Sequence, residues 1–135
     1  MVDFRSQLSE VLAADAGILE AFGMDVTEVP EGCCRFTCTV PDGLVNARGF
    51  GHGSIAFALM DTAAAYALRS VNAGGVTTNA NVIYVRGVAA HDELHGEVQV
   101  VSAGRRVASV RGEVYRADKL IAHGTFTFQV LDGMD

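Results

Sequence analysis

The most informative stretch of the chain is NARGFGHGSIAFALMDTAAAYALRS, which spans residues 46–70. Alanine, leucine and methionine dominate residues 52–70, and no glycine follows Gly53 there, so the composition predicts a helix. The helix is apolar on nearly every side, and we therefore expect most of its faces to be buried. Gly74 and Gly75 lie just beyond it and end it. The rest of the chain must wrap around this helix.

The segments on both sides of the helix follow the two-residue alternation of β-strands. Residues 24–40 predict two antiparallel strands around a turn at residues 30–32, and residues 3–22 predict an amphipathic N-terminal helix that can break near Gly17. Four long strands joined by short turns follow the central helix, at residues 76–86, 93–103, 106–116 and 120–131. This order predicts an α+β fold in which a long, curved antiparallel sheet wraps around the central helix.

The composition indicates one domain that meets a second copy of itself. The chain has 135 residues, of which 50% are hydrophobic and 19% are charged. This length favours a single domain over residues 1–135, with an N-terminal helix at 1–23 and a core at 24–131. The apolar fraction is too high for a disordered chain and high for a small monomer, so we expect part of the apolar surface to form an interface.

The charge is spread unevenly along the chain. A net charge of −6 makes neither nucleic acid nor an anionic membrane a natural partner of the whole molecule. Residues 86–119 are nearly neutral, because they hold six basic and five acidic side chains. A ligand that carries phosphate would therefore bind in this half, although any single arginine there is more typical of a solvated sheet edge.

The cysteines and histidines predict neither a disulfide framework nor a metal site. The three cysteines lie at positions 33, 34 and 38, and the alternation turns Cys34 and Cys38 inward, which predicts buried thiols in a reducing compartment. His91, His95 and His123 lack the spacing of metal ligands, so we expect packing or surface roles for them. The first 17 residues lack the apolar core of a signal peptide, and no window is apolar enough to span a membrane, which predicts a cytoplasmic protein.

Two features of the central segment predict chemistry. A glycine-bearing loop that leads into a helix leaves amide N–H groups unpaired at the positive end of the helix dipole, and Gly53 offers such an N–H to an oxyanion or a polarised carbonyl oxygen.

Asp61 is the only charged residue between His52 and Leu68. A carboxylate in an apolar helix needs a partner, and two readings stay open. Asp61 is either a catalytic group or a structural one that bonds to the backbone or to a threonine, with the candidates Thr62, Thr77 and Thr78.

Helix geometry separates these two groups within one chain. Gly53 and Asp61 are eight residues apart, which is about 12 Å along an α-helix. His52 and Asp61 lie on opposite sides of the same helix, because nine residues correspond to about 900° of turn. If both ends act on one substrate, a second, antiparallel copy of the helix must supply the other group. A two-fold dimer with two composite sites meets this requirement.

The segment NARGFGHGSIAFALMDTA, residues 46–63, resembles the signature N-x(5)-H-G-G-x-x-F-x-L-x-D-T-A of the PaaI-like hotdog-fold acyl-CoA thioesterases, the phenylacetic-acid-degradation group. The resemblance covers residues 22–130 and includes the turn at Gly104 and Arg105 and the final strand HGTFTF. Ser54 replaces the second glycine, and no proline follows Arg86. The resemblance implies a hotdog fold and a homodimer that pairs strands edge to edge, often within a tetramer of two dimers.

The resemblance also implies a role for each matching residue. The Gly53 amide would polarise a thioester carbonyl, Asn46 would help to bind that oxygen or the substrate, and His52 would shape the site. Asp61 of the partner chain would act as general base on water or attack the carbonyl directly, and the sequence leaves both routes open. The substrate-binding residues would include Thr77, which would hold the attacking water, together with Thr62, Arg86, Gly104, Arg105 and Arg106.

The resulting expectation is an acyl-CoA thioesterase for an aryl-acetyl or medium-chain acyl group. It would need no metal or redox cofactor, because coenzyme A is part of the substrate. Two alternatives remain, namely a hotdog acyl-thioester dehydratase or hydratase in which His52 and Asp61 meet across a dimer, and a non-catalytic acyl-CoA-binding domain. The candidates for the acyl pocket are Phe50, Phe57, Met60 and Tyr66, each equally consistent with plain core packing.

Overall fold

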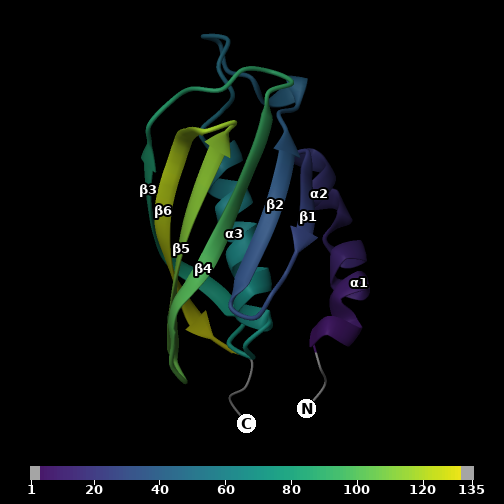
Figure 1. Ribbon diagram of the computed structural model, residues 1–135, viewed down its shortest axis with the longest axis vertical. Coiled ribbons are helices and arrows are strands. Elements are labelled where there is room, and N and C mark those ends of the chain that lie inside the picture. The colour runs from purple at the N-terminus through teal and green to yellow at the C-terminus, as the bar shows by residue number, and fades with distance from the viewer. Residues whose placement is uncertain (1–3, 132–135) are drawn as a thin grey trace.

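A computed structural model describes residues 4–131 of the chain. Six antiparallel strands form one sheet in the order β1-β2-β4-β5-β6-β3, and the sheet curves around the central helix α3 (Figure 1). The strands are β1 (Met24–Glu28), β2 (Cys33–Thr39), β3 (Gly75–Tyr84), β4 (Glu93–Ala103), β5 (Val107–Arg116) and β6 (Lys119–Val130). The helices are α1 (Phe4–Ala14), α2 (Ala16–Ala21) and α3 (Ser54–Arg69), with a short 3₁₀ helix at Asp42–Leu44. The predicted α+β architecture is confirmed.

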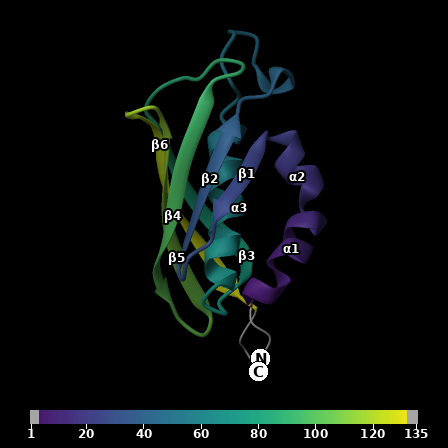
Figure 2. The same ribbon diagram turned by 45° about the vertical axis from the view of Figure 1, so that its right-hand side comes forward.

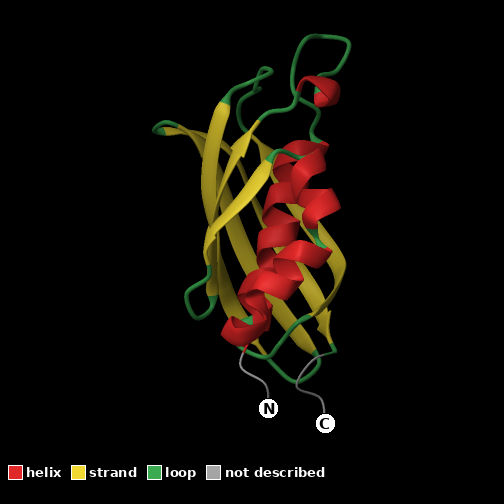
Figure 3. Ribbon diagram, turned by 90° about the vertical axis from the view of Figure 1, so that its right-hand side faces the viewer, coloured by secondary structure: helices red, strands yellow, loops and turns green. Residues whose placement is uncertain are grey.

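The core lies between α3 and the concave face of the sheet (Figure 3). Along the strands, every second side chain points toward the helix, as the alternation predicts. Phe36 on β2, Val98 on β4 and Phe126 on β6 are inward residues of this kind, and each is at most 1% exposed. On α3, Leu59, Met60 and Ala63 meet them and are fully buried.

The N-terminal segment forms two helices that lie beside α3 and β1 (Figure 2). The break falls at Asp15, two residues before the predicted point at Gly17, which instead lies within α2. The Tyr66 hydroxyl on α3 donates a hydrogen bond to Asp15 Oδ2 at 2.9 Å, which ties this break to the central helix. The Phe4 ring also packs edge-on against Tyr66, so α1 and α2 are anchored to the central helix.

The three cysteines are buried and carry free thiols, as predicted for Cys34 and Cys38, and Cys33 is buried as well. Burial raises the pKa of the Cys34 thiol to about 12 and that of Cys38 to about 11. These thiols therefore stay protonated at neutral pH and pack as small apolar groups.

One side of the structure is left uncovered. Strand β3 is at the edge of the sheet and pairs only with β6, and its side chains Val76 and Ile83 are about half exposed. The adjacent face of α3 is also only partly covered. This face carries Phe57, Asp61 and Ala65. The other faces of the helix are buried, as expected. No helix within residues 4–131 is long and apolar enough to cross a membrane.

Candidate active site

The loop before α3 is a folded turn that places the start of the helix. Asn46 Oδ1 accepts hydrogen bonds from the backbone N–H groups of Arg48 and Phe50, at 3.0 and 3.1 Å. The N–H of Gly51 donates to the carbonyl of Val88 at 2.7 Å, which ties the loop to the segment after β3. Asn46 thus organises the turn, and its predicted contact with a substrate oxygen stays a prediction.

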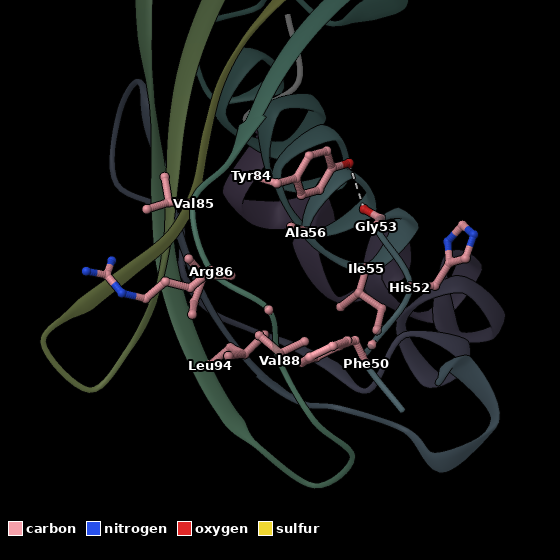
Figure 4. Close-up of a pocket in the computed structure, with 13 residues that line it drawn as sticks. Phe50, His52, Gly53, Ile55, Ala56, Tyr84, Val85, Arg86, Val88 and Leu94 are labelled. Carbon is pink, nitrogen blue, oxygen red and sulfur yellow. Dashed lines mark hydrogen bonds between the residues drawn. The ribbon is translucent and has the colours of Figure 1, made fainter. Parts of the chain in front are cut away.

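The first turn of α3 presents an unpaired donor at Gly53. The N–H of Gly53 has no acceptor within the described part of the chain, residues 4–131. The peptide groups on both sides of Gly53 are held in place, because Ile55 N–H donates to the His52 carbonyl at 3.0 Å and the Tyr84 hydroxyl donates to the Gly53 carbonyl at 2.8 Å (Figure 4). The Gly53 N–H is therefore a preorganised donor at the positive end of a helix.

The His52 side chain is also held in one orientation. The backbone N–H of Ser54 donates to His52 Nδ1 at 2.9 Å, so Nδ1 is an acceptor and the proton of the neutral ring lies on Nε2. Ser54 Oγ lies 2.8 Å from the same nitrogen. Ser54, which replaces a glycine of the family signature, thus orients His52 with its Nε2–H directed outward.

A pocket of about 310 Å³ opens between the start of α3 and the segment after β3 (Figure 4). Gly53 and Tyr84 lie on one side of it, and Phe50, Val88 and Leu94 lie on the other. Its apolar walls come from Phe50, Ile55, Ala56, Val88, Leu94 and Ile121. Burial raises the pKa of the Tyr84 hydroxyl, which favours the protonated form that donates to Gly53. The mostly apolar lining of this pocket suits an uncharged group.

Asp61 lies away from this pocket. It is partly buried on α3, and the Thr77 hydroxyl on β3 donates a hydrogen bond to Asp61 Oδ1 at 2.6 Å. Of the three threonines predicted as partners, the structure therefore selects Thr77, whereas the Thr78 hydroxyl points to the Thr127 carbonyl at 3.3 Å. Thr62 follows Asp61 on the partly covered face of α3.

The predicted phosphate ligands fall into two groups. Arg86 lines the pocket near Gly53, but its guanidinium points away from the pocket and donates to the Leu120 carbonyl at 2.7 Å (Figure 4). Arg105 and Arg106 follow Gly104 in the turn between β4 and β5. Arg105 lines a hollow with Val71, just beyond the end of α3, so this turn lies at the opposite end of that helix from Gly53.

The structure brings together only part of the predicted site. His52, Gly53 and Phe50 line one pocket, whereas Met60 and Tyr66 belong to the core and Phe57 packs edge-on against Phe126. Tyr84 was not singled out from the sequence, because its link to Gly53 spans 31 residues and depends on the tertiary fold. Its position at the end of a strand that flanks the central helix is the one signal that could have suggested it.

Metal ligands do not gather at this site. Within the residues that the structure describes, no group of three or more His, Cys, Asp or Glu side chains could hold a metal ion. The expected absence of a metal and of a redox cofactor stays a prediction.

A curved antiparallel sheet around one central helix, with a pocket at the first turn of that helix, defines the hotdog class of proteins. A family model described as the thioesterase superfamily matches residues 48–123, which is more than half of the chain. The chain belongs to this superfamily, and the predicted resemblance to its PaaI-like members is confirmed.

Individual relatives support the same assignment. The acyl-coenzyme A thioesterase PaaI of Escherichia coli strain K12 is 32% identical over 87 residues, which cover 64% of this chain and 62% of that protein, a little under two thirds of its length. The structure of E. coli PaaI, from the phenylacetic acid degradation operon, matches with a TM-score of 0.84 and 25% identity over 93% of this chain and 91% of that one.

Two further solved structures are similar over most of their length. The conserved protein PA5202 of Pseudomonas aeruginosa matches with a TM-score of 0.78 and 32% identity over 84% of this chain and 93% of that one. The protein smu.793 of Streptococcus mutans UA159, bound to acetyl CoA, matches with a TM-score of 0.77 and 26% identity over 81% of this chain and 89% of that one.

Proposed function

We propose that the protein hydrolyses acyl-CoA thioesters. The observation that carries this proposal is the unpaired N–H of Gly53, a residue that lines an apolar pocket at the positive end of α3. A thioester carbonyl oxygen gains negative charge as its carbon is attacked, and a fixed donor at that point stabilises the transition state more than the ground state. The similarity to the E. coli acyl-CoA thioesterase and to a protein bound to acetyl CoA supports this class of substrate.

Asp61 supplies the second half of the chemistry. The Thr77 hydroxyl donates a hydrogen bond to Asp61 Oδ1, and the other carboxylate oxygen takes part in the reaction. As general base, the carboxylate removes a proton from a water molecule that attacks the carbonyl carbon, and the tetrahedral intermediate then expels the coenzyme A thiolate. As nucleophile, it attacks the carbon itself and forms a mixed anhydride that water hydrolyses. Both routes need the carboxylate near the carbonyl carbon and the Gly53 N–H beside the carbonyl oxygen.

Two copies of the chain build each site in this proposal. Within one chain, Gly53 and Asp61 are separated by about 12 Å along α3. The partly covered face of α3 carries Asp61, and it adjoins the free edge of β3, so a second copy can cover both features at once. Pairing of two β3 edges around a two-fold axis sets the two α3 helices antiparallel, with Gly53 of one chain beside Asp61 of the other. Two such dimers would form the expected tetramer.

The same arrangement gathers the arginines. The chain that supplies Asp61 also brings Arg105 and Arg106, which lie beyond the end of its α3. The chain that supplies Gly53 brings Arg86. Coenzyme A is long enough to reach from the thioester to these guanidinium groups, which suit bidentate contact with phosphate. Gly104 shapes the turn, Thr62 lies beside the carboxylate, and His52 borders the carbonyl end of the pocket.

A hydrolysis screen tests the proposal. The purified protein is offered aryl-acetyl-CoA and straight-chain acyl-CoA thioesters, and release of the coenzyme A thiol is measured. We expect turnover of aryl-acetyl or medium-chain substrates, because the pocket is apolar and of moderate size. Binding of these thioesters without turnover would favour a non-catalytic acyl-CoA-binding domain, and water addition to an enoyl-CoA would favour a hydratase.

A further inference from the structure

The ring of Phe50 packs against Gly87. A β-carbon built on Gly87 would lie only 2.8 Å from Phe50 Cδ1, and the three atoms nearest to it all belong to the Phe50 ring. No alanine at position 87 can coexist with the ring in this place. The backbone of Gly87 does not have a positive φ, so flexibility does not explain the glycine. The absence of a side chain at position 87 leaves the space in which the Phe50 ring lies.

Hydrogen bonds hold the backbone around Phe50 in place beside Gly87. Phe50 N–H donates to Asn46 Oδ1, and the Phe50 carbonyl accepts from Asn46 N–H at 2.6 Å. The next residue, Gly51, bonds to the Val88 carbonyl, which holds the loop against the segment that contains Gly87. These bonds anchor the backbone of Phe50, and its ring lies in a place against Gly87 although 52% of the residue is exposed.

That place is the end of the pocket opposite the Gly53 N–H (Figure 4). Val88 and Leu94 lie beside Phe50 at this end, but they are 7% and 2% exposed and belong to the core. A change at either would disturb the packing of the whole fold. Phe50 is the part of the end wall that borders solvent, so its size can change without a change in the core.

We propose that Phe50, packed against Gly87, is the specificity-determining residue that limits the length of the acyl group. The inference rests on the proposed function in one respect, that the thioester carbonyl lies at the Gly53 N–H. An uncharged acyl chain or aryl ring then runs along Ile55 and Ala56 toward Phe50, which stops it. Each methylene that fits before the ring adds to binding, and the first that does not fit is left in contact with water or pushes against the ring.

The test measures binding of S-(2-oxoalkyl)-CoA thioethers, which keep a carbonyl group for the Gly53 N–H but cannot be hydrolysed, with chains of 4 to 16 carbons. Dissociation constants are obtained by titration calorimetry for the wild type and three variants. We expect Phe50→Ala to move the tightest binding to chains about two to four carbons longer, with a gain of about fourfold for each newly buried methylene. Phe50→Trp should move it to shorter chains. Gly87→Ala should flatten the profile because the methyl group displaces the ring. Gly43→Ala, in the short 3₁₀ helix with open space around the glycine, should keep the wild-type profile.

The outcomes separate this inference from the proposed function. Identical chain-length profiles in the wild type, Phe50→Ala and Phe50→Trp would overturn the role of Phe50, even if the wild type hydrolyses thioesters. Opposite shifts in the two Phe50 variants support the inference, because a purely structural role would weaken all chains alike. If the shifts appear but no acyl-CoA is hydrolysed, the proposed function fails and the role of Phe50 stands. A wild type that binds none of the thioethers overturns the inference.

Discussion

Thr77 on β3 donates a hydrogen bond to Asp61 Oδ1 on α3, at 2.6 Å. This contact answers the question of how a carboxylate is tolerated in an apolar helix, since a hydroxyl from the edge strand satisfies one of its oxygens. It also fixes the orientation of the carboxylate. Asp61 lies on the side of α3 that neither the sheet nor the N-terminal helices cover completely. A structural partner and a catalytic orientation are thus compatible at this residue.

Replacement of Asp61 by asparagine tests the carboxylate. Asp61→Asn is nearly isosteric, and the amide oxygen can still accept the Thr77 hydrogen bond, so we expect the melting temperature and the oligomeric state to stay close to those of the wild type. Turnover should fall at least a hundredfold, because an amide is neither a general base nor a nucleophile. Thiol release from the best acyl-CoA substrate measures this loss. Near-wild-type turnover in a folded variant would remove the catalytic role of Asp61.

Replacement of Thr77 tests the orientation of that carboxylate. Thr77→Val keeps the shape of the side chain but removes the donor, and we expect kcat to fall about tenfold while KM changes little. Thr77→Ser keeps the hydroxyl and should retain most of the activity. Equal losses in the valine and serine variants would mean that packing, and not the hydrogen bond, is what matters at this position.

Complementation between two inactive variants tests whether each site uses two chains. Gly53→Pro removes the proposed oxyanion donor, and proline is compatible with the φ of −58° at this position. Mixed with Asp61→Asn under conditions of subunit exchange, it should restore about one quarter of wild-type activity, because about half of the dimers are mixed and each holds one intact site. Gly53→Ala, which keeps the N–H, is the control and should stay active. No recovery despite demonstrated exchange would place the whole site within one chain.

Replacement of Arg105 and Arg106 tests the contact with coenzyme A. In the double variant Arg105→Ala, Arg106→Ala we expect KM for acyl-CoA to rise about three- to thirtyfold, since charge-assisted contacts with phosphate are lost. KM for acyl thioesters of N-acetylcysteamine, which lack the nucleotide, should not change. Arg111→Ala is a matched control, because Arg111 is exposed on β5 and bonds to Gln99. An unchanged KM for acyl-CoA would remove both arginines from the site.

Local sequence pattern accounts for most of the fold. The alternation of Cys34, Phe36 and Cys38 fixes which face of β2 is buried, and the run of small and apolar residues around Leu59 marks the central helix, because both patterns follow from side-chain burial alone. The break in the N-terminal segment falls at Asp15, close to the predicted Gly17, but the hydrogen bond that joins Asp15 to Tyr66, 51 residues away, could not be predicted. Local propensity carries no information about such a contact.

The candidate site also contains residues that the sequence predicts and residues that depend on the tertiary structure. Gly53 and Asp61 stand out in the sequence, because one begins a helix after a glycine-bearing loop and the other is a lone charge among apolar neighbours. The choice of Thr77 over Thr78 could not be made from sequence, because the β-bulge between Thr77 and Asn79 decides which side chain faces α3. The pocket wall around Gly87 and the hydroxyl of Tyr84 likewise depend on how three distant segments meet.

Replacement of Tyr84 tests how much the fixed geometry at Gly53 contributes. The Tyr84 hydroxyl holds the Gly53 carbonyl at 2.8 Å, and that carbonyl has only one other donor, the Phe57 N–H at 3.4 Å, within residues 4–131. Tyr84→Phe keeps the ring but frees the peptide, so the neighbouring N–H loses part of its alignment. We expect kcat to fall about tenfold with little change in KM, because alignment matters most when the carbonyl oxygen carries negative charge. An equal loss at Tyr115→Phe, a tyrosine on the outer side of the sheet, or a rise in KM alone, would show that the hydroxyl acts through stability or binding and not through the Gly53 donor.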